Sequence, residues 1–395
     1  MQGILLYAVA ASFVAALATH LMVPPVARLA VLLRALDHPG ERKLQTGAVP
    51  RLGGAAIALG LLLGGTGATV SLWGRIGAAV GRGELLALAF GTITVFLVGV
   101  VDDIVGVSAA KKLLFQLVAA WPLVHAGWAF EVLRLPFLGE IHLGLLGGFV
   151  SLLWIVGVTN AINLIDGLDG LAGGVVAIIS VSFLGYAMLQ GNAGTVILMA
   201  AVAGSCLGFL RHNWEPARVF MGDSGSLMLG FLLASTAVHS SLKAPAAVAI
   251  LVPILALGVP VMDTLLVMAV RFLDRPKSAL IGRFLRMFQA DRQHLHHLLA
   301  HFGGERRRIV AVIYGVVLSF CALALFVAFT GETALGVVLV VLELTVILTM
   351  RQMGMAMEAR RLARLQREEI KAEVLGLGLG PAAAPKAGGV RRIAR

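Results

Sequence analysis

Long apolar runs, separated by short polar segments, recur along the whole chain. Each run is close to the ~20 residues that an α-helix needs to cross the hydrocarbon core of a bilayer. The runs cover residues 3–23, 52–73, 85–101, 113–128, 145–162, 171–190, 194–210, 225–241, 245–270, 309–330 and 333–350. Because they are continuously apolar rather than alternating, they do not fit the strands of a membrane β-barrel. The pattern predicts an all-α, polytopic membrane protein with about eleven transmembrane helices.

The composition supports this class. Of the 395 residues, 59% are hydrophobic and 13% are charged, whereas about 25% of the residues of a soluble domain are charged. The first run has no basic segment before it and no small-residue cleavage site after it, so we interpret it as a retained helix rather than a signal peptide. We expect residues 1–350 to form the membrane domain. Residues 351–395 would form a basic tail, helical from Arg351 to Val374 and disordered beyond.

The distribution of basic residues predicts the orientation. With eleven spans, 28 of the 32 Lys and Arg residues fall on one side of the membrane. The four on the other side are Arg75, Arg82, Arg134 and Lys243. Because basic loops stay in the cytoplasm, the N-terminus is expected outside and the C-terminus in the cytoplasm. The formal charge of +11 then reflects this rule and attraction to anionic lipid, and it does not indicate nucleic-acid binding.

Four clusters of polar residues lie at the cytoplasmic ends of the spans. They are Asp102 with Asp103, the group Asn160, Asn163, Asp166 and Asp169, the single Asp223, and the group His294, His296 and His297. Each cluster alone also fits a structural role, such as a solvated helix end, a glycine-rich turn, a helix N-cap or an interfacial loop. The spacing of three would place Asn163, Asp166 and Asp169 on one helical face. Because all four clusters fall on the same side, we predict a single interfacial site.

The residue types at this site favour phosphate chemistry with a hard metal ion. Carboxylate and amide oxygens prefer Mg²⁺, or Mn²⁺ in its place, to zinc, and the histidines lack an accompanying HExxH motif or Cys pair. The chain has no Walker-type phosphate loop, so ATP-driven transport is not supported. An ion-coupled transporter stays as the alternative from another class. It would need acidic residues in the middle of several spans, and only Asp263 and Glu343 are candidates.

Several motifs in order make the sequence resemble the polyprenyl-phosphate N-acetylhexosamine-1-phosphate transferase family. They are DHPGERK…PRLGG (Asp37 to Gly54), VDDIVGV (Val101 to Val107), NAINLIDGLDGL (Asn160 to Leu171), NWEPARVFMGDSGS (Asn213 to Ser226) and DRQHLHH (Asp291 to His297). The HxHH pattern is similar to the branch that starts O-antigen, enterobacterial common antigen, teichoic acid or arabinogalactan linkers. One departure is Gln45, where relatives often carry His, which weakens a role for a histidine in the first loop.

The resemblance implies that undecaprenyl phosphate attacks the β-phosphorus of a UDP-N-acetylhexosamine, most simply UDP-GlcNAc, and releases UMP. It also implies roles for twelve residues. Asn163 and Asp223 would bind Mg²⁺; Asp102 and Asp103 would lie near the lipid phosphate; Lys112 would meet phosphate oxygens; Phe220 and Asp169 would contact uracil; Asp166 and Asn213 would line the nucleotide-sugar site; His294, His296 and His297 would hold the phosphate or the sugar. A phospho-N-acetylmuramoyl-pentapeptide transferase is the alternative within the family, although its usual HHH pattern differs from HxHH.

The expected partners are therefore the UDP-sugar, undecaprenyl phosphate and the lipid bilayer, with no nucleic acid and a possible homodimer. The resemblance implies the inner (plasma) membrane, with the active site on the cytoplasmic face. A phosphate monoester has a second pKa near ~6, so the acceptor is already mostly a dianion at neutral pH. It needs positioning and charge neutralisation more than deprotonation. We predict direct attack by the lipid phosphate, with Asp102 and Asp103 as positioning groups rather than nucleophiles.

Overall fold

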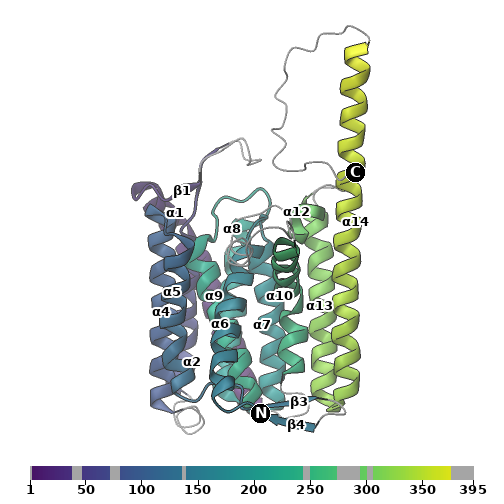
Figure 1. Cartoon of the computed structure of the whole chain (residues 1–395). Coiled ribbons are helices and arrows are strands. Elements are labelled where there is room, and N and C mark those ends of the chain that lie inside the picture. Colours follow the sequence, from purple (N-terminus) through teal and green to yellow (C-terminus); the bar gives the residue numbers. More distant parts are fainter. Residues whose placement is uncertain are drawn as a thin grey trace.

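The fold is a bundle of long helices with two small hairpins at its ends (Figure 1). The computed structural model of the chain describes residues 2–37, 47–71, 81–135, 139–242, 250–273, 294–299 and 306–374. The helices are α1 (Gln2–Leu32), α2 (Gly53–Ser71), α4 (Arg82–Val105), α5 (Ala109–His125), α6 (Leu145–Ile165), α7 (Leu171–Leu189), α8 (Ala193–Asn213), α9 (Gly222–Leu242), α10 (Leu251–Leu273), α12 (Leu295–Leu299), α13 (Arg306–Thr330) and α14 (Thr333–Val374). The strands are β1 (Leu36–Asp37), β2 (Val49–Pro50), β3 (Val132–Leu135) and β4 (Gly139–His142). The predicted disordered tail beyond Val374 and the departure at Gln45 lie outside the described residues.

Each predicted span coincides with one of the long helices, so the all-α, multi-pass class is confirmed. Ten of the helices in the described residues are long and apolar enough to cross a membrane, and α5 has 17 residues. How many of them cross the membrane stays a prediction. The helix ends differ from the predicted edges. The first helix continues through Pro24 and Pro25 to Leu32 instead of ending at residue 23.

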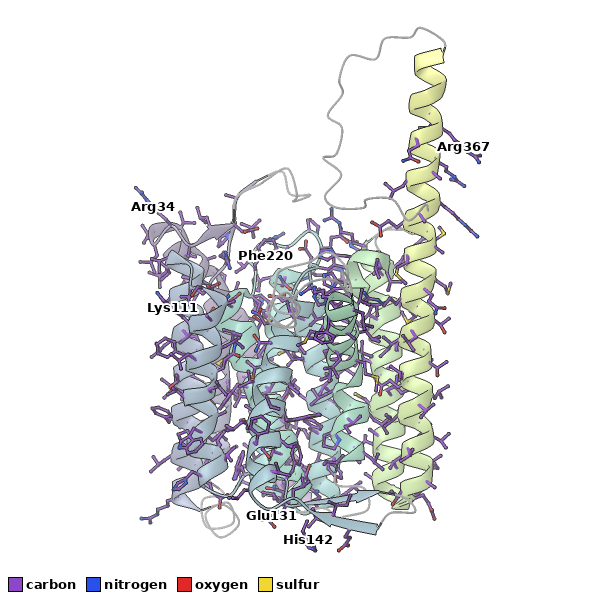
Figure 2. The ribbon with its side chains drawn as sticks, viewed as in Figure 1. Arg34, Lys111, Glu131, His142, Phe220 and Arg367 are labelled. Atoms are coloured by element: carbon purple, nitrogen blue, oxygen red, sulfur yellow. The ribbon has the colours of Figure 1, made fainter. Side chains whose placement is uncertain are left out.

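The two ends of the bundle carry different parts of the chain. Helix α1 begins at the end that carries the β3–β4 hairpin, whereas α14 ends beyond the opposite end (Figure 1). Figure 2 shows Arg34, Lys111 and Phe220 at the α12 end and Glu131 and His142 at the hairpin end. The polar clusters singled out in the sequence therefore gather at one end. Which end faces the cytoplasm stays a prediction.

Helix α9 is the centre of the bundle. In its apolar window 94% of the residues are buried, compared with 22% in α1 and α14, and it packs against α2, α4, α6 and α7. Two glycines allow this close packing. A Cβ on Gly99 of α4 would collide with the backbone of Asp223, and one on Gly54 of α2 would collide with the backbone of Gly225. The backbones of α2, α4 and α9 therefore meet where α9 begins.

The β1–β2 hairpin covers this same end of α9. The two strands pair antiparallel, and the chain after β2 pairs with the residues that precede α9. The Phe220 N–H donates to the Pro50 carbonyl at 2.8 Å, and the Gly53 N–H donates to the Phe220 carbonyl at 2.9 Å. These bonds fix Asp37 and Arg51 beside the start of α9.

Helix α14 does not break at the predicted boundary between residues 350 and 351. It is one helix of 42 residues, and at 1.5 Å per residue it is about 63 Å long. Only about 30 Å of that length is needed to cross the hydrocarbon core. The remainder extends past the other helices (Figure 1), as expected for the predicted helical part of the tail.

Candidate functional site

Asp103 connects α4 to the start of α9. Its side chain is 4% exposed, and its two oxygens accept the backbone N–H groups of Asp223 at 2.9 Å and Ser224 at 3.0 Å. Gly222, with φ of 71°, fits here because a Cβ at that position would collide with the Asp103 carboxylate. A carboxylate that accepts the first N–H groups of a helix satisfies donors that have no partner within the helix. The interpretation of Asp223 as the N-cap is therefore wrong, since Asp103 of the neighbouring helix caps α9.

Two cations neutralise the carboxylates around this cap. Lys112 Nζ lies 2.8 Å from Asp223 Oδ2 and 3.3 Å from Asp102 Oδ1. Arg51 Nη2 lies 3.3 Å from Asp103 Oδ1 and 4.0 Å from Asp102 Oδ2. The three carboxylates each offer an oxygen within 4.8 Å of the others. Such a cluster can hold a cation, and Lys112 and Arg51 offset part of its charge.

Asn163 lies near the end of α6, with its amide oriented by α9. Its nitrogen donates to Ser226 Oγ at 2.9 Å, and Ser226 in turn donates to the Gly222 carbonyl at 3.0 Å. With the nitrogen engaged, the amide oxygen is the atom that can act as a ligand. The expected common helical face for Asn163, Asp166 and Asp169 is wrong. Helix α6 ends at Ile165, and the glycine-rich residues that follow form a turn.

The turn after α6 is held by the segment between α8 and α9. Asn213 is 3% exposed; its Oδ1 accepts the Gly170 N–H at 2.9 Å, and its Nδ2 donates to the Val219 carbonyl at 2.9 Å. Asp169 Oδ2 accepts the Ala217 N–H at 2.9 Å. Asn213 and Asp169 therefore join two loops, and this arrangement sets the shape of the space between them.

That space is a cavity of about 310 Å³ at the α12 end of the bundle. Its lining residues are Asp37, Arg51, Asn163, Asp166, Gly167, Leu168, Asp169, Asn213, Phe220, Gly222 and Asp223. Six of the twelve predicted site residues are among them, brought from three separate parts of the sequence. The other six are not among the lining residues. Asp102 and Asp103 belong to α4, Lys112 belongs to α5, and the three histidines belong to α12 and the residue before it.

The electrostatics of the cavity favour a bound cation beside the carboxylates. Burial, together with the negative charges of Asp223 and Asp103, raises the pKa of Asp166 to about 7, against the opposing effect of Arg51. A positive charge close to such a carboxylate would lower its pKa again and favour the ionised form. The cavity therefore combines carboxylate and amide oxygens with a local excess of negative charge.

The histidines approach the cavity through one contact. A Cβ on Gly167 would collide with His296 Nε2, so His296 packs directly on the cavity wall. Its ring is 2% exposed, and its two nitrogens have no hydrogen-bond partner among the described residues. Burial lowers the pKa of His296 well below its ordinary value, with His297 and His294 adding to the effect, so the ring is neutral at pH 7. His294 instead points to Asp263 of α10, at 3.0 Å.

Sequence reasoning gave no role to several residues of the site, among them Arg51, Ser226 and Gly167. Arg51 could have been found because it stands in the PRLGG motif directly before α2. Ser226 follows Asp223 by three residues, which places both near one face of α9. Gly167 has no signal in the sequence beyond its place in the motif. Its contact with His296 joins segments about 130 residues apart and depends on how α12 packs.

Comparison with known proteins agrees with the arrangement of the motifs. The model of glycosyl transferase family 4 matches residues 85–241. The Bacillus subtilis protein named "Probable undecaprenyl-phosphate N-acetylglucosaminyl 1-phosphate transferase" is 34% identical over 320 residues, which cover 80% of this chain and 84% of that protein. The Mycobacterium leprae protein named "Decaprenyl-phosphate N-acetylglucosaminephosphotransferase" is 34% identical over 86% of this chain and 89% of its own length. A "Phospho-N-acetylmuramoyl-pentapeptide-transferase" of Caldicellulosiruptor bescii is 29% identical over 73% of this chain and 86% of its own length.

Proposed function

Because the chain belongs to the polyprenyl-phosphate N-acetylhexosamine-1-phosphate transferase family, we propose that it transfers GlcNAc-1-phosphate from UDP-GlcNAc to undecaprenyl phosphate. The acceptor phosphate forms a new P–O bond to the β-phosphorus, the bond between the β-phosphorus and the bridging oxygen breaks, and UMP leaves with that oxygen. The observation that carries the proposal is the cavity at one end of the bundle, which brings Asn163, Asp166 and Asp223 together with Arg51.

The place of the reaction follows from the two substrates. UDP-GlcNAc is soluble and undecaprenyl phosphate is anchored in lipid, so they can meet only at the membrane surface. The protein is a multi-pass membrane protein, and its polar clusters lie at one end of the bundle. We assign that end to the cytoplasmic face of the inner (plasma) membrane, where the lipid-linked sugar would start a cell-envelope polysaccharide. The expected homodimer stays a prediction.

The residues that line the cavity fit a Mg²⁺ ion. The ligands would be Asn163 and Asp223, with Asp166 beside them, and all three offer the oxygen atoms that Mg²⁺ prefers. The bond from the Asn163 nitrogen to Ser226 supports this assignment, because it leaves the amide oxygen as the donor atom. When bound, the ion neutralises negative charge on the pyrophosphate. Mn²⁺ satisfies the same donor set.

The protein's own cations act on the same anions. Lys112 lies between Asp102 and Asp223, at the junction of the predicted acceptor side and the cavity. It can donate to phosphate oxygens of the acceptor while Asp223 keeps its ammonium in place. Arg51 lines the cavity and can donate to the donor's pyrophosphate. The acceptor phosphate and the donor pyrophosphate are both anions and repel each other as they approach. Positive groups that are already fixed in place lower this repulsion and stabilise the negative charge of the transition state.

Direct attack by the lipid phosphate is favoured over an aspartyl intermediate. Both oxygens of Asp103 accept backbone hydrogen bonds, and Arg51 contacts one of them. Asp102 Oδ1 accepts the Val107 N–H at 2.7 Å and also contacts Lys112. A carboxylate that attacked phosphorus would have to give up such bonds. Both aspartates are better suited to hold Asp223 and Lys112 in position.

The remaining predicted contacts belong to the nucleotide. Phe220 presents an aromatic ring to the cavity, and a ring of this kind can stack on uracil. Asp169 and Asn213 each accept a hydrogen bond from a loop backbone N–H. We assign them the role of shaping the nucleotide-sugar site, with Asp169 near the polar edge of uracil.

The experiment is a substrate panel. Purified protein is given undecaprenyl phosphate, Mg²⁺ and, in separate reactions, UDP-GlcNAc, UDP-GalNAc and UDP-MurNAc-pentapeptide, and both UMP and the lipid product are measured. We expect lipid-dependent release of UMP with UDP-GlcNAc. Turnover of UDP-MurNAc-pentapeptide alone would instead assign the chain to the activity for which the C. bescii relative is named. Absence of lipid-dependent UMP from every donor would refute the proposal.

A further inference from the structure

A second buried aspartate, Asp263 of α10, lies outside the cavity and organises the histidine segment. It is 5% exposed. Its Oδ1 accepts the N–H of Leu295, the first residue of α12, at 2.9 Å. Its Oδ2 lies 3.0 Å from His294 Nδ1. Arg351 of α14 is also buried, and its Nη1 lies 3.8 Å from Asp263 Oδ1. One carboxylate thus connects α10, α12 and α14.

The opposite side of α12 rests on α14. A Cβ on Gly354 would lie 2.7 Å from the Cβ of Leu298, so α14 touches α12 at a position without a side chain. Helix α12 has five residues, and isolated helices this short are not stable in water. Its orientation therefore depends on its anchors. In the described residues these anchors include the Asp263 cap at its start, the Gly354 contact near its end and packing against α13.

From these contacts we propose that Asp263 and Arg351 are positioning residues that set His296 against Gly167 and thereby control the binding of the nucleotide sugar. The proposal rests on the proposed function, because it assigns the pair to the donor side of that reaction. Neither residue lines the cavity. They act through α12, whose His296 ring packs on the wall between Asp166 and Leu168.

The geometry also says which substrate is affected. Gly167 belongs to the turn after α6, which lines the cavity, whereas Asp102 and Lys112 lie on the α4–α5 side of Asp223. Loss of the Asp263 anchor therefore displaces a wall of the donor site and leaves the acceptor side intact. The KM for UDP-GlcNAc rises, kcat falls, and the KM for undecaprenyl phosphate does not change.

Four substitutions and one matched control test this. Asp263→Ala removes every contact, whereas Asp263→Asn keeps an oxygen for the Leu295 N–H and loses the charge. Arg351→Gln removes the cation and Arg351→Lys keeps it. The control is Glu343→Gln, because Glu343 is buried at the same α10–α14 interface, where it packs against Gly258 of α10.

A small displacement of a substrate-positioning group costs up to about 100-fold in rate. We expect at least about a tenfold fall in kcat/KM for UDP-GlcNAc in Asp263→Ala, a smaller fall in Asp263→Asn, and recovery in Arg351→Lys relative to Arg351→Gln. Glu343→Gln should keep both KM values. Equal changes of both KM values, or none in Asp263→Ala, would overturn the proposal.

A cross-link provides a readout that does not depend on activity. Cysteines replace Leu298 and Gly354 in a background where Cys206 and Cys321 are Ala. A Cβ on Gly354 would lie 2.7 Å from the Leu298 Cβ. This is about 1 Å closer than in a disulfide, so α12 and α14 need to separate only slightly for the bond to form. We expect rapid disulfide formation with Asp263 present and at least about tenfold slower formation in Asp263→Ala. An unchanged rate would refute the anchoring role. If the chain turns over no donor, the proposed function fails, and the cross-link still decides whether Asp263 anchors α12.

Discussion

The contact between Asp103 and the start of α9 leads to a quantitative prediction for Asp103→Asn. The carboxylate accepts the backbone N–H groups of Asp223 and Ser224 at 2.9 and 3.0 Å. An asparagine has one acceptor oxygen, so its NH₂ group faces the second N–H as another donor. A buried donor without an acceptor costs about 1–3 kcal/mol. We therefore expect the free energy of unfolding to fall by about 1–3 kcal/mol.

Asp102→Asn is the matched control, because it makes the same chemical change one residue away. The oxygen of the new amide can still accept the Val107 N–H, which now bonds to Asp102 Oδ1 at 2.7 Å. What is lost are the ion pairs with Lys112 at 3.3 Å and with Arg51 at 4.0 Å, and partly exposed pairs contribute about 0–1 kcal/mol each. Asp102→Asn should therefore lower the free energy of unfolding less than Asp103→Asn.

The assay compares thermal unfolding of the two variants in the same detergent with their release of UMP. Asp103→Asn should unfold at the lower temperature and turn over more slowly, because Asp223 shifts with the start of α9. Raising the pH past the second pKa of the phosphate, about 6, should not restore its rate, as it would if Asp103 were only a base. Wild-type stability of Asp103→Asn would refute the capping argument. A lipid-independent burst of UMP that Asp103→Asn abolishes would identify a covalent intermediate instead.

Three further predictions concern the metal, the orientation and the cavity wall. Asp223→Ala and Asn163→Ala should each lose most turnover, and EDTA should abolish activity until Mg²⁺ or Mn²⁺ is added, because both side chains are proposed ligands. In intact cells an impermeant thiol reagent should label a cysteine at Glu140 of β4 and not one at Arg367, because β4 (Figure 1) and Arg367 (Figure 2) lie toward opposite ends of the molecule. Gly167→Ala should raise the KM for UDP-GlcNAc, because its Cβ would displace His296.

Each of these predictions has a control. Full activity in a chelated, metal-free preparation would contradict the metal assignment, provided that both alanine variants still insert into the membrane. Labelling at Arg367 with protection at Glu140 would reverse the orientation. For the cavity wall the control is Gly157→Ala, since a Cβ on this glycine of α6 meets no atom within 4 Å. An equal change of KM in both alanine variants would exclude a specific contact with His296.

The helices could be predicted because their signal is local. A run such as 225–241 is apolar throughout, and any run of that length is stable as a helix in lipid, where every backbone group must bond internally. The helix ends were less accessible. The rule that would place Asn163, Asp166 and Asp169 on one face of a helix fails here, since α6 ends at Ile165. Asp166 and Asp169 reach the cavity from the turn that follows.

Six of the twelve site residues predicted from the sequence line the cavity, but the contacts among them could not be predicted. Asp102 and Asp103 are adjacent in sequence and both acidic, yet Asp103 caps α9 and Asp102 contacts Lys112. That difference depends on which side of α4 faces α9. This in turn depends on packing between segments 120 residues apart in the sequence. Asp263 shows the same limit. It was noted as an intramembrane acid that a transporter would require, whereas the structure uses it to hold α12.

The glycine contacts at the start of α9 have a consequence for how new substrate preferences can arise. Any larger residue at Gly54 or Gly99 would separate the helices that bring Asp103 to Asp223. Substitution of either glycine should therefore abolish activity rather than change the preference for one nucleotide sugar over another. Leu168 and Phe220 also line the cavity, but their side chains do not fill a contact between two helix backbones. We call these two residues the rim of the cavity. Divergence toward another nucleotide sugar should therefore accumulate at the rim, and a small library directed there would sample most of the accessible specificities.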